Sequence, residues 1–435
     1  MNNLRSSAFW TRDLLSGGKV FRHYNDIEEV SALSGAQQVQ LSRDRAESMA
    51  CYASANVSYY SKSRGVPLSA FPVVDKNIIR GQRSAFLSGL YRKSNLTEMV
   101  TSGSTGTPFA VLQDKGKRLR NAADTIWWGQ HAGYAIGTPL FYFRIWTSIN
   151  RKSSLSAWLE NIIPVDVMDL SSENLSKIAA NLLSKEEPFS LLGYASALES
   201  VGKYMKETGG KCTKGSCRAI IAISEALESE TKTLLESQFG ACAVSRYSNI
   251  ENGIIAQQST NGTSHFLVNW ASYWVEILDL ENDVPVADGT LGRIVVTDLH
   301  NKGMPFVRYD TGDTGSMLVD DYTGQRVMTK IEGRRMDAVY DTRGRPISPF
   351  TINNQMCRYP EVAQYQFIQE DEKSYKFKIN TQSGLLFLKE AQLIAEYKAY
   401  LGQDAKISIE YVSGIPLLKS GKRKKVVNMM TARTQ

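Results

Sequence analysis

A strand–helix–strand pattern near the middle of the chain constrains the fold most. The short apolar run RAIIAIS (218–224) is followed by ESETKTLLESQFG (228–240), whose final glycine is a common helix end, and then by ACAVSRY (241–247). Short apolar runs on either side of a helical segment are typical of parallel strands in an α/β sheet. We therefore predict an α/β fold with a parallel sheet in this region.

Polar segments follow both of these expected strands. They are SEA, which is Ser224, Glu225 and Ala226, and YSNIENG, which begins with Tyr247 and Ser248. In open parallel sheets, ligands bind beyond the carboxyl ends of the strands. We expect both segments to face one binding crevice.

The segment TSGSTGTP (101–108) concentrates small residues that can donate hydrogen bonds. Glycines allow close approach of the backbone, and successive amides and hydroxyls can bind a phosphate. The candidate phosphate-binding residues are Thr101, Ser102, Gly103, Ser104, Thr105, Gly106 and Thr107. The same composition is common in flexible surface loops, so the segment alone leaves both interpretations open.

The residues on either side of this loop exclude a Walker phosphate loop. Strand-like runs flank it, LTEMV (96–100) and FAVLQD (109–114), and Phe109 stands where a lysine would be expected. A Walker loop instead leads from a strand into a helix and ends in Gly-Lys-Ser/Thr.

Other helices and strands are expected along the rest of the chain. We predict helices over residues 1–95, at 115–133 and at 172–185. Alternating strands follow, separated by glycine-containing turns: HFLVNW (265–270), YWVEILDL (273–280), RIVVTDL (293–299), FVRY (306–309), SMLVD (316–320) and RVMTKI (326–331).

The pattern beyond Gly333 alternates between strand and helix again, so we place a domain boundary near Gly333–Asp337. The predicted architecture is a large N-terminal domain (1–332) of α/β subdomains with an additional β-rich part. A small α+β C-terminal domain (333–435) follows it.

Composition is typical of an ordinary globular protein, with 42% hydrophobic and 22% charged residues in 435. The net charge of +7 is modest for this size. The five cysteines are scattered and odd in number, which fits a reducing compartment and no structural metal. The sequence has neither a signal-peptide pattern nor a long apolar run, so we expect a cytoplasmic protein without a membrane span.

Five short motifs, in order, resemble those of the adenylate-forming ligase superfamily. They are the TSGSTGTP loop, Tyr-x-x-x-Glu at Tyr247–Glu251, Tyr-x-Thr-Gly-Asp at Tyr309–Asp313, Gly-Arg at Gly333–Arg334 and Ser-Gly-Lys at Ser420–Lys422. The sequence is most similar to the phenylacetate–CoA ligase branch, which includes capsular polysaccharide biosynthesis proteins. Each motif alone is weak, but five in the family's order, from about residue 70 onward, are specific.

The resemblance implies a role for each motif in the binding and use of ATP. The glycine-rich loop would bind the phosphates, and Glu251 would bind Mg²⁺, since a carboxylate is a suitable hard ligand. Tyr247 would offer its flat face to adenine, and Asp313 would accept hydrogen bonds from the ribose hydroxyls. Arg334 would contact ribose or phosphate through its fork of donors. Lys422 would stabilise charge on the reacting carboxylate and the α-phosphate. The resemblance also implies that the small C-terminal domain, which carries Lys422, is mobile.

The sequence departs from the family's pattern at three places. Many relatives have a basic residue where this chain has Phe109, and the hinge has Met336 before Asp337, which leaves the hinge residue open. Some members bind zinc after the Tyr-x-x-x-Glu element. This chain keeps His265 but has Gln257 and Gln258 where a cysteine could stand, so we expect no zinc.

The reaction implied is ATP plus a carboxylic acid giving an acyl-adenylate and pyrophosphate. The acyl group then passes to coenzyme A, or to an amine or hydroxyl of a sugar or small molecule. We expect the acid pocket to include Trp127, Trp128, Tyr194 and the SEA segment, although paired aromatic residues are more often core. The alternatives are a nucleic-acid-binding protein that uses the basic tail KSGKRKK, and a catalytically inactive nucleotide-binding relative. No nucleic-acid partner is expected, Lys424 and Lys425 are interpreted as solvated charge, and the oligomeric state stays open.

Overall fold

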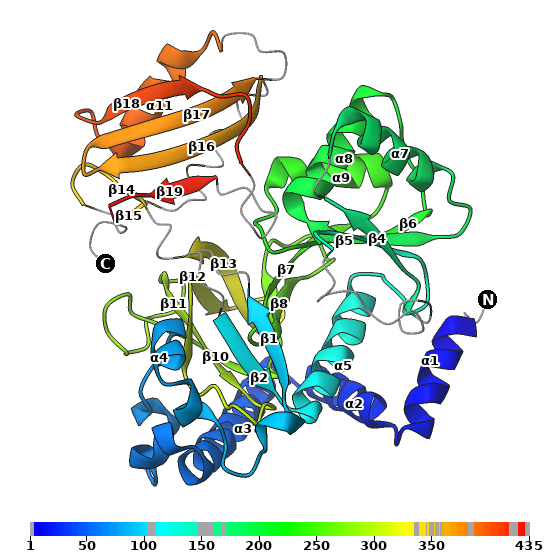
Figure 1. Cartoon of the computed structure of the whole chain (residues 1–435), viewed down its shortest axis with the longest axis vertical. Coiled ribbons are helices and arrows are strands. Elements are labelled where there is room, and N and C mark those ends of the chain that lie inside the picture. The colour runs from blue at the N-terminus through cyan, green and yellow to red at the C-terminus, as the bar shows by residue number, and fades with distance from the viewer. Residues whose placement is uncertain are drawn as a thin grey trace. The chain divides into compact units, whose positions relative to one another are not determined.

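A computed structural model of the chain gives two compact units, each described here by itself (Figure 1). The structure describes residues 4–101, 109–146, 158, 160–167, 170–334, 339–344, 346–347, 352, 356, 359, 361–381, 387–416 and 425–430. The larger unit comprises Met1–Thr311 and Gly315–Ile331, and the smaller comprises Gly312–Thr314 and Glu332–Gln435. The division into an N-terminal domain (1–332) that binds ATP and the acid, and a C-terminal domain (333–435) that carries the catalytic lysine, stays a prediction.

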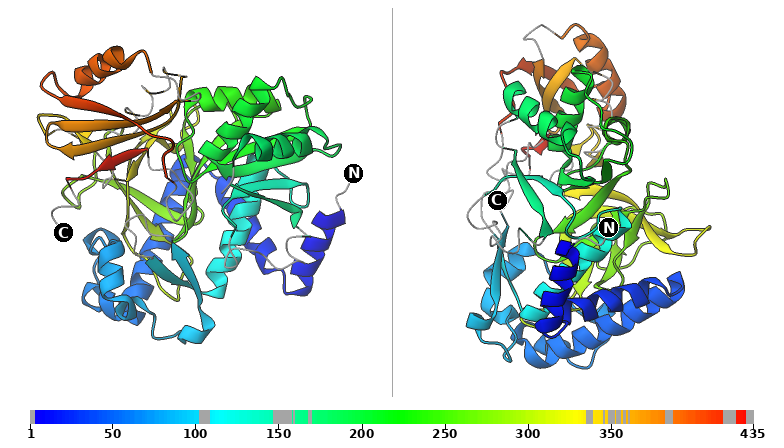
Figure 2. Two further views of the ribbon diagram at one scale, coloured as in Figure 1. Left: turned by 45° about the horizontal axis from the view of Figure 1, so that its top comes forward. Right: turned by 90° about the vertical axis from the view of Figure 1, so that its right-hand side faces the viewer.

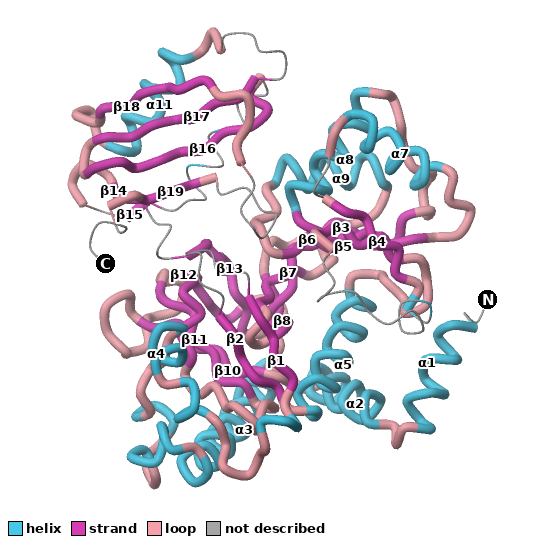
Figure 3. The backbone as a smooth tube through the Cα atoms, in the orientation of Figure 1, coloured by secondary structure: helices cyan, strands magenta, loops and turns pink. Residues whose placement is uncertain are grey.

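An 11-stranded sheet, formed mostly by residues of the larger unit, has the order β10-β11-β12-β13-β9-β8-β7-β6-β5-β3-β4 (Figure 3). Its parallel part consists of β4 (Ile162–Asp166), β3 (Leu140–Arg144), β5 (Phe189–Tyr194), β6 (Cys217–Ile223) and β7 (Ala243–Asn249). The remaining strands are β8 (Gly253–Gln258), β9 (Phe266–Val268), β10 (Tyr273–Leu278), β11 (Gly292–Asp298), β12 (Tyr309–Val319) and β13 (Arg326–Arg334).

The predicted strand–helix–strand unit is confirmed. Strand β6, helix α9 (Ser229–Phe239) and strand β7 follow one another, and β6 and β7 pair in parallel. Gly240 ends α9 in the left-handed region at φ 67°, where a residue without Cβ meets no steric penalty. The fold class expected from the sequence, α/β with a larger and a smaller part, is likewise confirmed.

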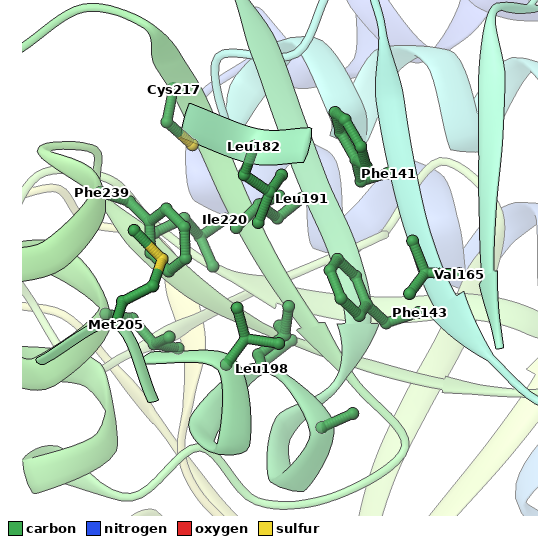
Figure 4. Close-up of a cluster of buried hydrophobic side chains, with 14 of the residues drawn as sticks. Phe141, Phe143, Val165, Leu182, Leu191, Leu198, Met205, Cys217, Ile220 and Phe239 are labelled. Carbon is green, nitrogen blue, oxygen red and sulfur yellow. The ribbon is translucent and has the colours of Figure 1, made fainter. Parts of the chain in front are cut away.

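Helices α7 (Ser172–Leu183), α8 (Ala195–Glu207) and α9 cover one face of the parallel strands. Their apolar side chains form one core with the strands, and Figure 4 shows Phe141 and Phe143 of β3 directed into it beside Leu191 and Leu198. Because successive side chains of a strand point to opposite faces, Tyr142 and Arg144 belong to the other face. That face packs against residues at the end of helix α5 (Lys115–His131).

The N-terminal region is helical as predicted only as far as residue 56. It forms α1 (Leu4–Leu15), α2 (Lys19–Ser31) and the long α3 (Gly35–Asn56), which packs against β10 and β11 (Figure 2). Between residues 57 and 95, only short helices occur: four 3-10 helices, Ser58–Ser63, Leu68–Ala70, Arg83–Phe86 and Lys93–Asn95, and α4 (Lys76–Gly81). Prolines and glycines interrupt the pattern here, as the sequence FPVV and the turn at Gly65 (φ 80°) show.

A hairpin of β1 (Thr97–Thr101) and β2 (Phe109–Gln113) confirms the two strands expected around the glycine-rich loop. The strands are antiparallel, with Thr101 opposite Phe109. Asp114 then caps α5, since its Oδ1 accepts a hydrogen bond from the Lys117 amide at 2.9 Å.

The prediction of two separate strands at 306–309 and 316–320 is wrong. A single strand, β12, spans Tyr309–Val319 and contains the Tyr-x-Thr-Gly-Asp element. Polar residues and glycine interrupt the apolar alternation on which the prediction depended. Gly312 adopts φ 81°, a conformation that only glycine reaches without strain, so the strand continues through it.

The smaller unit contains a four-stranded sheet in the order β18-β17-β16-β19, covered by helix α11 (Glu390–Leu401). Its strands are β16 (Val362–Asp371), β17 (Ser374–Thr381), β18 (Lys406–Tyr411) and β19 (Val426–Asn428), and a short pair, β14 (Val339–Tyr340) and β15 (Pro346–Ile347), precedes them. Lys425 lies with its Nζ 5.6 Å from the Tyr365 ring centroid. None of the helices in the described ranges of either unit has the length and apolarity that a membrane span requires.

Candidate functional site

A buried carboxylate lies where the parallel sheet meets the antiparallel strands. Glu251 follows β7 at the turn into β8 and is 2% exposed. Its Oε1 lies 2.6 Å from Nζ of Lys76 and accepts a hydrogen bond from the Tyr309 hydroxyl at 3.3 Å. Both contacts use Oε1, so Oε2 takes part in neither.

The main chain around Glu251 is held by buried side chains from three elements. Gln113 donates from Nε2 to the Glu251 carbonyl at 3.1 Å, and the Tyr273 hydroxyl donates to the Asn252 carbonyl at 2.5 Å. Lys117 donates to that hydroxyl at 2.9 Å and forms an ion pair with Asp298 at 2.7 Å. These contacts fix the position of the carboxylate through the backbone.

The Tyr-x-x-x-Glu and Tyr-x-Thr-Gly-Asp elements meet in this site. The Tyr247 hydroxyl donates to Oγ1 of Thr311 at 3.2 Å, and Thr311 donates onward to the Ile294 carbonyl at 2.9 Å. With the contact from Tyr309 to Glu251, this makes two hydrogen bonds between motifs that are about sixty residues apart in sequence. Their order in the chain could not show this pairing, which arises because β7, β8 and β12 belong to one sheet.

The SEA segment lies at the carboxyl end of β6, as expected. Ser224 has φ 68°, which is unusual for a residue other than glycine and is typical of functional turns. Glu225 accepts a hydrogen bond from the Ser196 amide at 2.8 Å, so its carboxylate is engaged at the start of α8. Ser224 and Ala226 are exposed, and Ser248 is half-buried at the end of β7.

Several predicted site residues fall outside the described part of the chain. They are Ser102, Gly103, Ser104, Thr105, Gly106, Thr107, Met336, Asp337 and Lys422. Of the others, Thr101 ends β1, Asp313 lies in β12 and Arg334 ends β13. Phe109, where relatives often have a basic residue, is buried in the core beside Val111 and Phe306.

The two tryptophans expected in the acid pocket lie in a core between helices. Trp127 donates from Nε1 to Oε2 of Glu28 in α2 at 2.6 Å, and its ring stacks on His131 at 3.5 Å. Trp128 packs in the same cluster. Tyr194, by contrast, ends β5 near Arg144 and Glu225; burial raises the pKa of its hydroxyl, and the charge of Arg144 opposes that rise.

Lys76 was missed in the sequence, although one signal pointed to it. It is the first residue of α4, directly after the capping residue Asp75. A cation at a helix N-terminus is slightly unfavourable with respect to the helix dipole, so an acidic partner elsewhere is favoured. In this structure the partner is Glu251.

Gln257 and Gln258, which stand where a zinc-binding cysteine was considered, have hydrogen-bonding roles. Gln257 accepts from Nε of Arg246 at 2.8 Å, and Gln258 accepts from the Ser245 amide at 3.0 Å. His265 lies with Nδ1 3.2 Å from Oδ2 of Asp320. In the ranges that the structure describes, no three His, Cys, Asp or Glu side chains cluster as metal ligands. The expectation of no zinc stays a prediction.

The surroundings of Glu251 fit a magnesium ion that is shared with a bound nucleotide. Mg²⁺ is usually held by one or two carboxylates and by substrate phosphates. Glu251 offers one carboxylate oxygen outside its present contacts, and its position is fixed by Tyr309 and the turn.

Comparison with known proteins supports the motif-based resemblance. Residues 339–429 match the family described as CapK C-terminal domain. A phenylacetate–coenzyme A ligase of Escherichia coli (strain K12) is 21% identical over 198 residues, which are 45% of this chain. That match spans 44% of the length of the relative.

Solved structures share the fold. A 2-hydroxyisobutyryl-CoA ligase, in a postadenylation state with an acyl-AMP, has a TM-score of 0.71 at 16% identity over 92% of each chain. MatB from Rhodopseudomonas palustris, with ATP bound, has a TM-score of 0.57 at 16% identity, covering 78% of this chain and 68% of its own. These neighbours do not favour the nucleic-acid-binding alternative. The comparisons confirm that the chain resembles the adenylate-forming ligases, within them the phenylacetate–CoA ligase branch that includes capsular polysaccharide biosynthesis proteins.

Proposed function

We propose that this protein is an ATP-dependent ligase that activates a carboxylic acid as an acyl-adenylate. The observation that carries the proposal is Glu251, a buried carboxylate oriented by Tyr309 and by a turn fixed through Gln113. A buried charge is costly unless it is paired and hydrogen-bonded, and Glu251 is held by Lys76 and Tyr309. A carboxylate positioned beside residues of two nucleotide-binding motifs suits the binding of a metal–triphosphate complex.

In the proposed reaction, a carboxylate oxygen of the acid attacks the α-phosphorus of ATP. The new C–O–P linkage forms as the bond between the α- and β-phosphates breaks, and pyrophosphate leaves. Bound Mg²⁺ would neutralise charge on the phosphates. The ring of Tyr247 is held by its hydroxyl contact with Thr311 and offers a flat face to adenine.

The glycine-rich loop is proposed to bind the triphosphate, with Asp313 and Arg334 on the ribose. In support, the loop connects the strands of the β1–β2 hairpin, and β2 leads directly to Gln113, which contacts the Glu251 carbonyl. Lys422 is proposed to act on the reacting carboxylate. Lys76 is a further proposed cation for the phosphates, since it already lies beside Glu251.

The acceptor is proposed to be coenzyme A, with an amine or hydroxyl of a sugar as the alternative. The names of two relatives, a phenylacetate–coenzyme A ligase and a 2-hydroxyisobutyryl-CoA ligase, support coenzyme A. The match to the CapK C-terminal domain supports a role in capsular polysaccharide synthesis. A cytoplasmic location is part of the proposal and depends on the cysteine pattern.

ATP–pyrophosphate exchange tests this proposal. Labelled pyrophosphate is incubated with ATP, Mg²⁺ and the protein in the presence of aryl, fatty, amino or sugar acids. We expect label in ATP only when a suitable acid is present. Exchange that needs no acid, or its absence with every acid class, would contradict the proposal.

A further inference from the structure

Arg246 is a buried cation at the carboxyl end of the parallel sheet, and it has no ionic partner among the described residues. It is 6% exposed, and the one hydrogen bond that its side chain makes to the described residues runs from Nε to Oε1 of Gln257 at 2.8 Å. Its Nη2 is buried without a hydrogen-bond partner. Burial lowers the pKa of the guanidinium to about 10, so the group is still charged at neutral pH.

The other buried arginines in the described part of the chain show what such a group normally requires. Arg120 pairs with Asp26 at 2.6 Å, Arg293 with Asp310 at 3.1 Å and Arg308 with Glu276 at 3.2 Å. Removing a charge from water is costly unless it is paired and hydrogen-bonded. Nη2 of Arg120 is also buried without a hydrogen-bond partner, so Arg246 differs from the structural arginines of the same unit in its lack of an ion pair with the described residues.

A second arginine lies on the same face of the sheet. Arg144 ends β3, and its Nε is also buried without a hydrogen-bond partner. Its Nη1 donates to the Tyr142 hydroxyl at 3.3 Å. Tyr142 is also the nearby group whose charge acts on the pKa of Arg246, so one tyrosine lies close to both guanidinium groups.

Strand register places both arginines at the level where ligands bind to such sheets. Arg246 is paired with Ile223, and Ile223 with Tyr194, the last residue of β5. Gly193 of β5 pairs with Phe143, so Arg144 is level with the same row. With three strand spacings between them, the two arginine backbones are about 14 Å apart, a distance that two long side chains can span toward one small ligand.

We infer that the acid activated by this protein carries a second anionic group, a carboxylate or a phosphate, which binds to Arg246 with Arg144 beside it. The inference rests on the proposed function and names the substrate class of that site. A guanidinium offers a planar fork of donors that matches either anion. The row of strand ends also carries Tyr194 and the SEA segment, which the sequence had assigned to the acid pocket.

The test compares matched acids, one with and one without a second anionic group. The pairs are succinate with its monomethyl ester, glutarate with its monomethyl ester, and 3-phosphoglycerate with glycerate. Acid-dependent ATP–pyrophosphate exchange is measured for the wild type, Arg246→Met, Arg246→Lys and Arg218→Met. Arg218 is an exposed arginine near the opposite end of β6 and serves as the matched control.

The wild type and Arg218→Met are expected to prefer the doubly anionic member of at least one pair by about 10- to 100-fold in kcat/KM, the value of a charged hydrogen bond. Arg246→Met is expected to lose that preference and keep its rate with the neutral member, whereas Arg246→Lys keeps part of it. The pair that responds distinguishes a carboxylate from a phosphate.

Equal use of both members by the wild type would overturn the inference. So would an equal loss for both members in Arg246→Met, since that pattern indicates a structural role or contact with the reacting carboxylate. Calorimetric binding of the same acids without ATP separates this inference from the proposed function. Preferential binding that depends on Arg246 without any exchange supports the anion site and contradicts the ligase. Exchange without any such preference supports the ligase and contradicts the anion site.

Discussion

Nζ of Lys76 lies 2.6 Å from Oε1 of Glu251, and this ion pair joins a short helix to the turn between two strands of the main sheet. Glu251 is buried, whereas Lys76 retains some exposure. The lysine thus compensates a carboxylate that the fold has removed from water. In the proposed function, the same carboxylate receives Mg²⁺ and the lysine becomes available to phosphate oxygens.

Removal of Lys76 should destabilise the protein without ligands. Lys76→Met leaves Glu251 buried without its cation, and the expected loss is about 1–3 kcal/mol in the free energy of unfolding, between the values for exposed and buried pairs. Adding Glu251→Gln to the Lys76→Met variant should restore most of the lost free energy of unfolding. Urea denaturation of the two single variants and the double variant measures the coupling. Lys93→Met, at an exposed lysine, is the control, and additive effects of the two changes would show that the pair contributes nothing.

Glu251→Gln should slow adenylate formation, because an amide oxygen is a weaker ligand for Mg²⁺ than a carboxylate. We expect a loss of about 100-fold or more in exchange rate, the order seen when one preorganised electrostatic contact is removed. The rate is measured at limiting Mg²⁺, with thermal unfolding as a check on folding. A wild-type rate under these conditions excludes a metal-binding role for Glu251.

The apolar pattern predicted the parts of the fold that depend on local sequence. Strands β6 and β7 and helix α9 were predicted because apolar runs, a helical segment and Gly240 coincide there. Strand β5 was missed, although all of its residues are buried, since a short apolar run does not distinguish a strand from a buried helix. Strand β12 was divided wrongly, because its central glycine and polar residues belong to a functional element.

The site residues that belong to a sequence motif could be predicted, whereas the contacts between elements far apart in the sequence could not. Tyr247 and Glu251 follow from the resemblance, but their contacts with Thr311 and Lys76 come from strands and helices that only the fold brings together. Trp127 was expected in the acid pocket, which stays a prediction; its hydrogen bond to Glu28 of a neighbouring helix could not be predicted from the sequence. Arg246 gave no signal, because its missing partner is visible only in the structure.

Stability should fall below about pH 6.5 because of two partly buried histidines, His23 and His300. Burial and the nearby Arg120 lower the pKa of both histidines from the ordinary value of 6.5. The pKa of His300 is well below that value, and the pKa of His23 is below it. The unfolded chain therefore takes up these protons first as pH falls, so the stability present above pH 6.5 is lost below it. Each histidine contributes at most about 1.4 kcal/mol per pH unit.

His300→Gln provides the check on this pH dependence. Its amide can still donate to the Ala271 carbonyl, which lies 3.2 Å from Nε2 of His300. The variant should lose less stability than the wild type between pH 6.5 and 5.5 in urea denaturation. An identical pH dependence in the two proteins would show that His300 does not titrate in this range.

Lys422 should act in adenylate formation and not in acyl transfer. In the adenylate-forming ligases that this chain resembles, the Ser-Gly-Lys motif belongs to a small domain that presents different residues to the two half-reactions. A lysine that stabilises charge between the carboxylate and the α-phosphate has no role once the adenylate exists. Lys422→Ala is expected to abolish exchange but to transfer the acyl group from a synthetic acyl-adenylate, while Lys424→Ala changes neither step. Equal slowing of both steps, or of neither, contradicts this division.

Oxygen transfer from the acid to AMP tests the central claim most directly. The acid that supports exchange is prepared with ¹⁸O in both carboxylate oxygens, and hydroxylamine is supplied as a general acceptor. If an acyl-adenylate forms, the oxygen that bridges carbon and phosphorus stays with phosphorus when the acyl group leaves, so mass spectrometry should find one ¹⁸O in each AMP. Label in inorganic phosphate together with ADP would instead indicate an acyl phosphate, and unlabelled AMP would show that no mixed anhydride forms; either result would contradict the account.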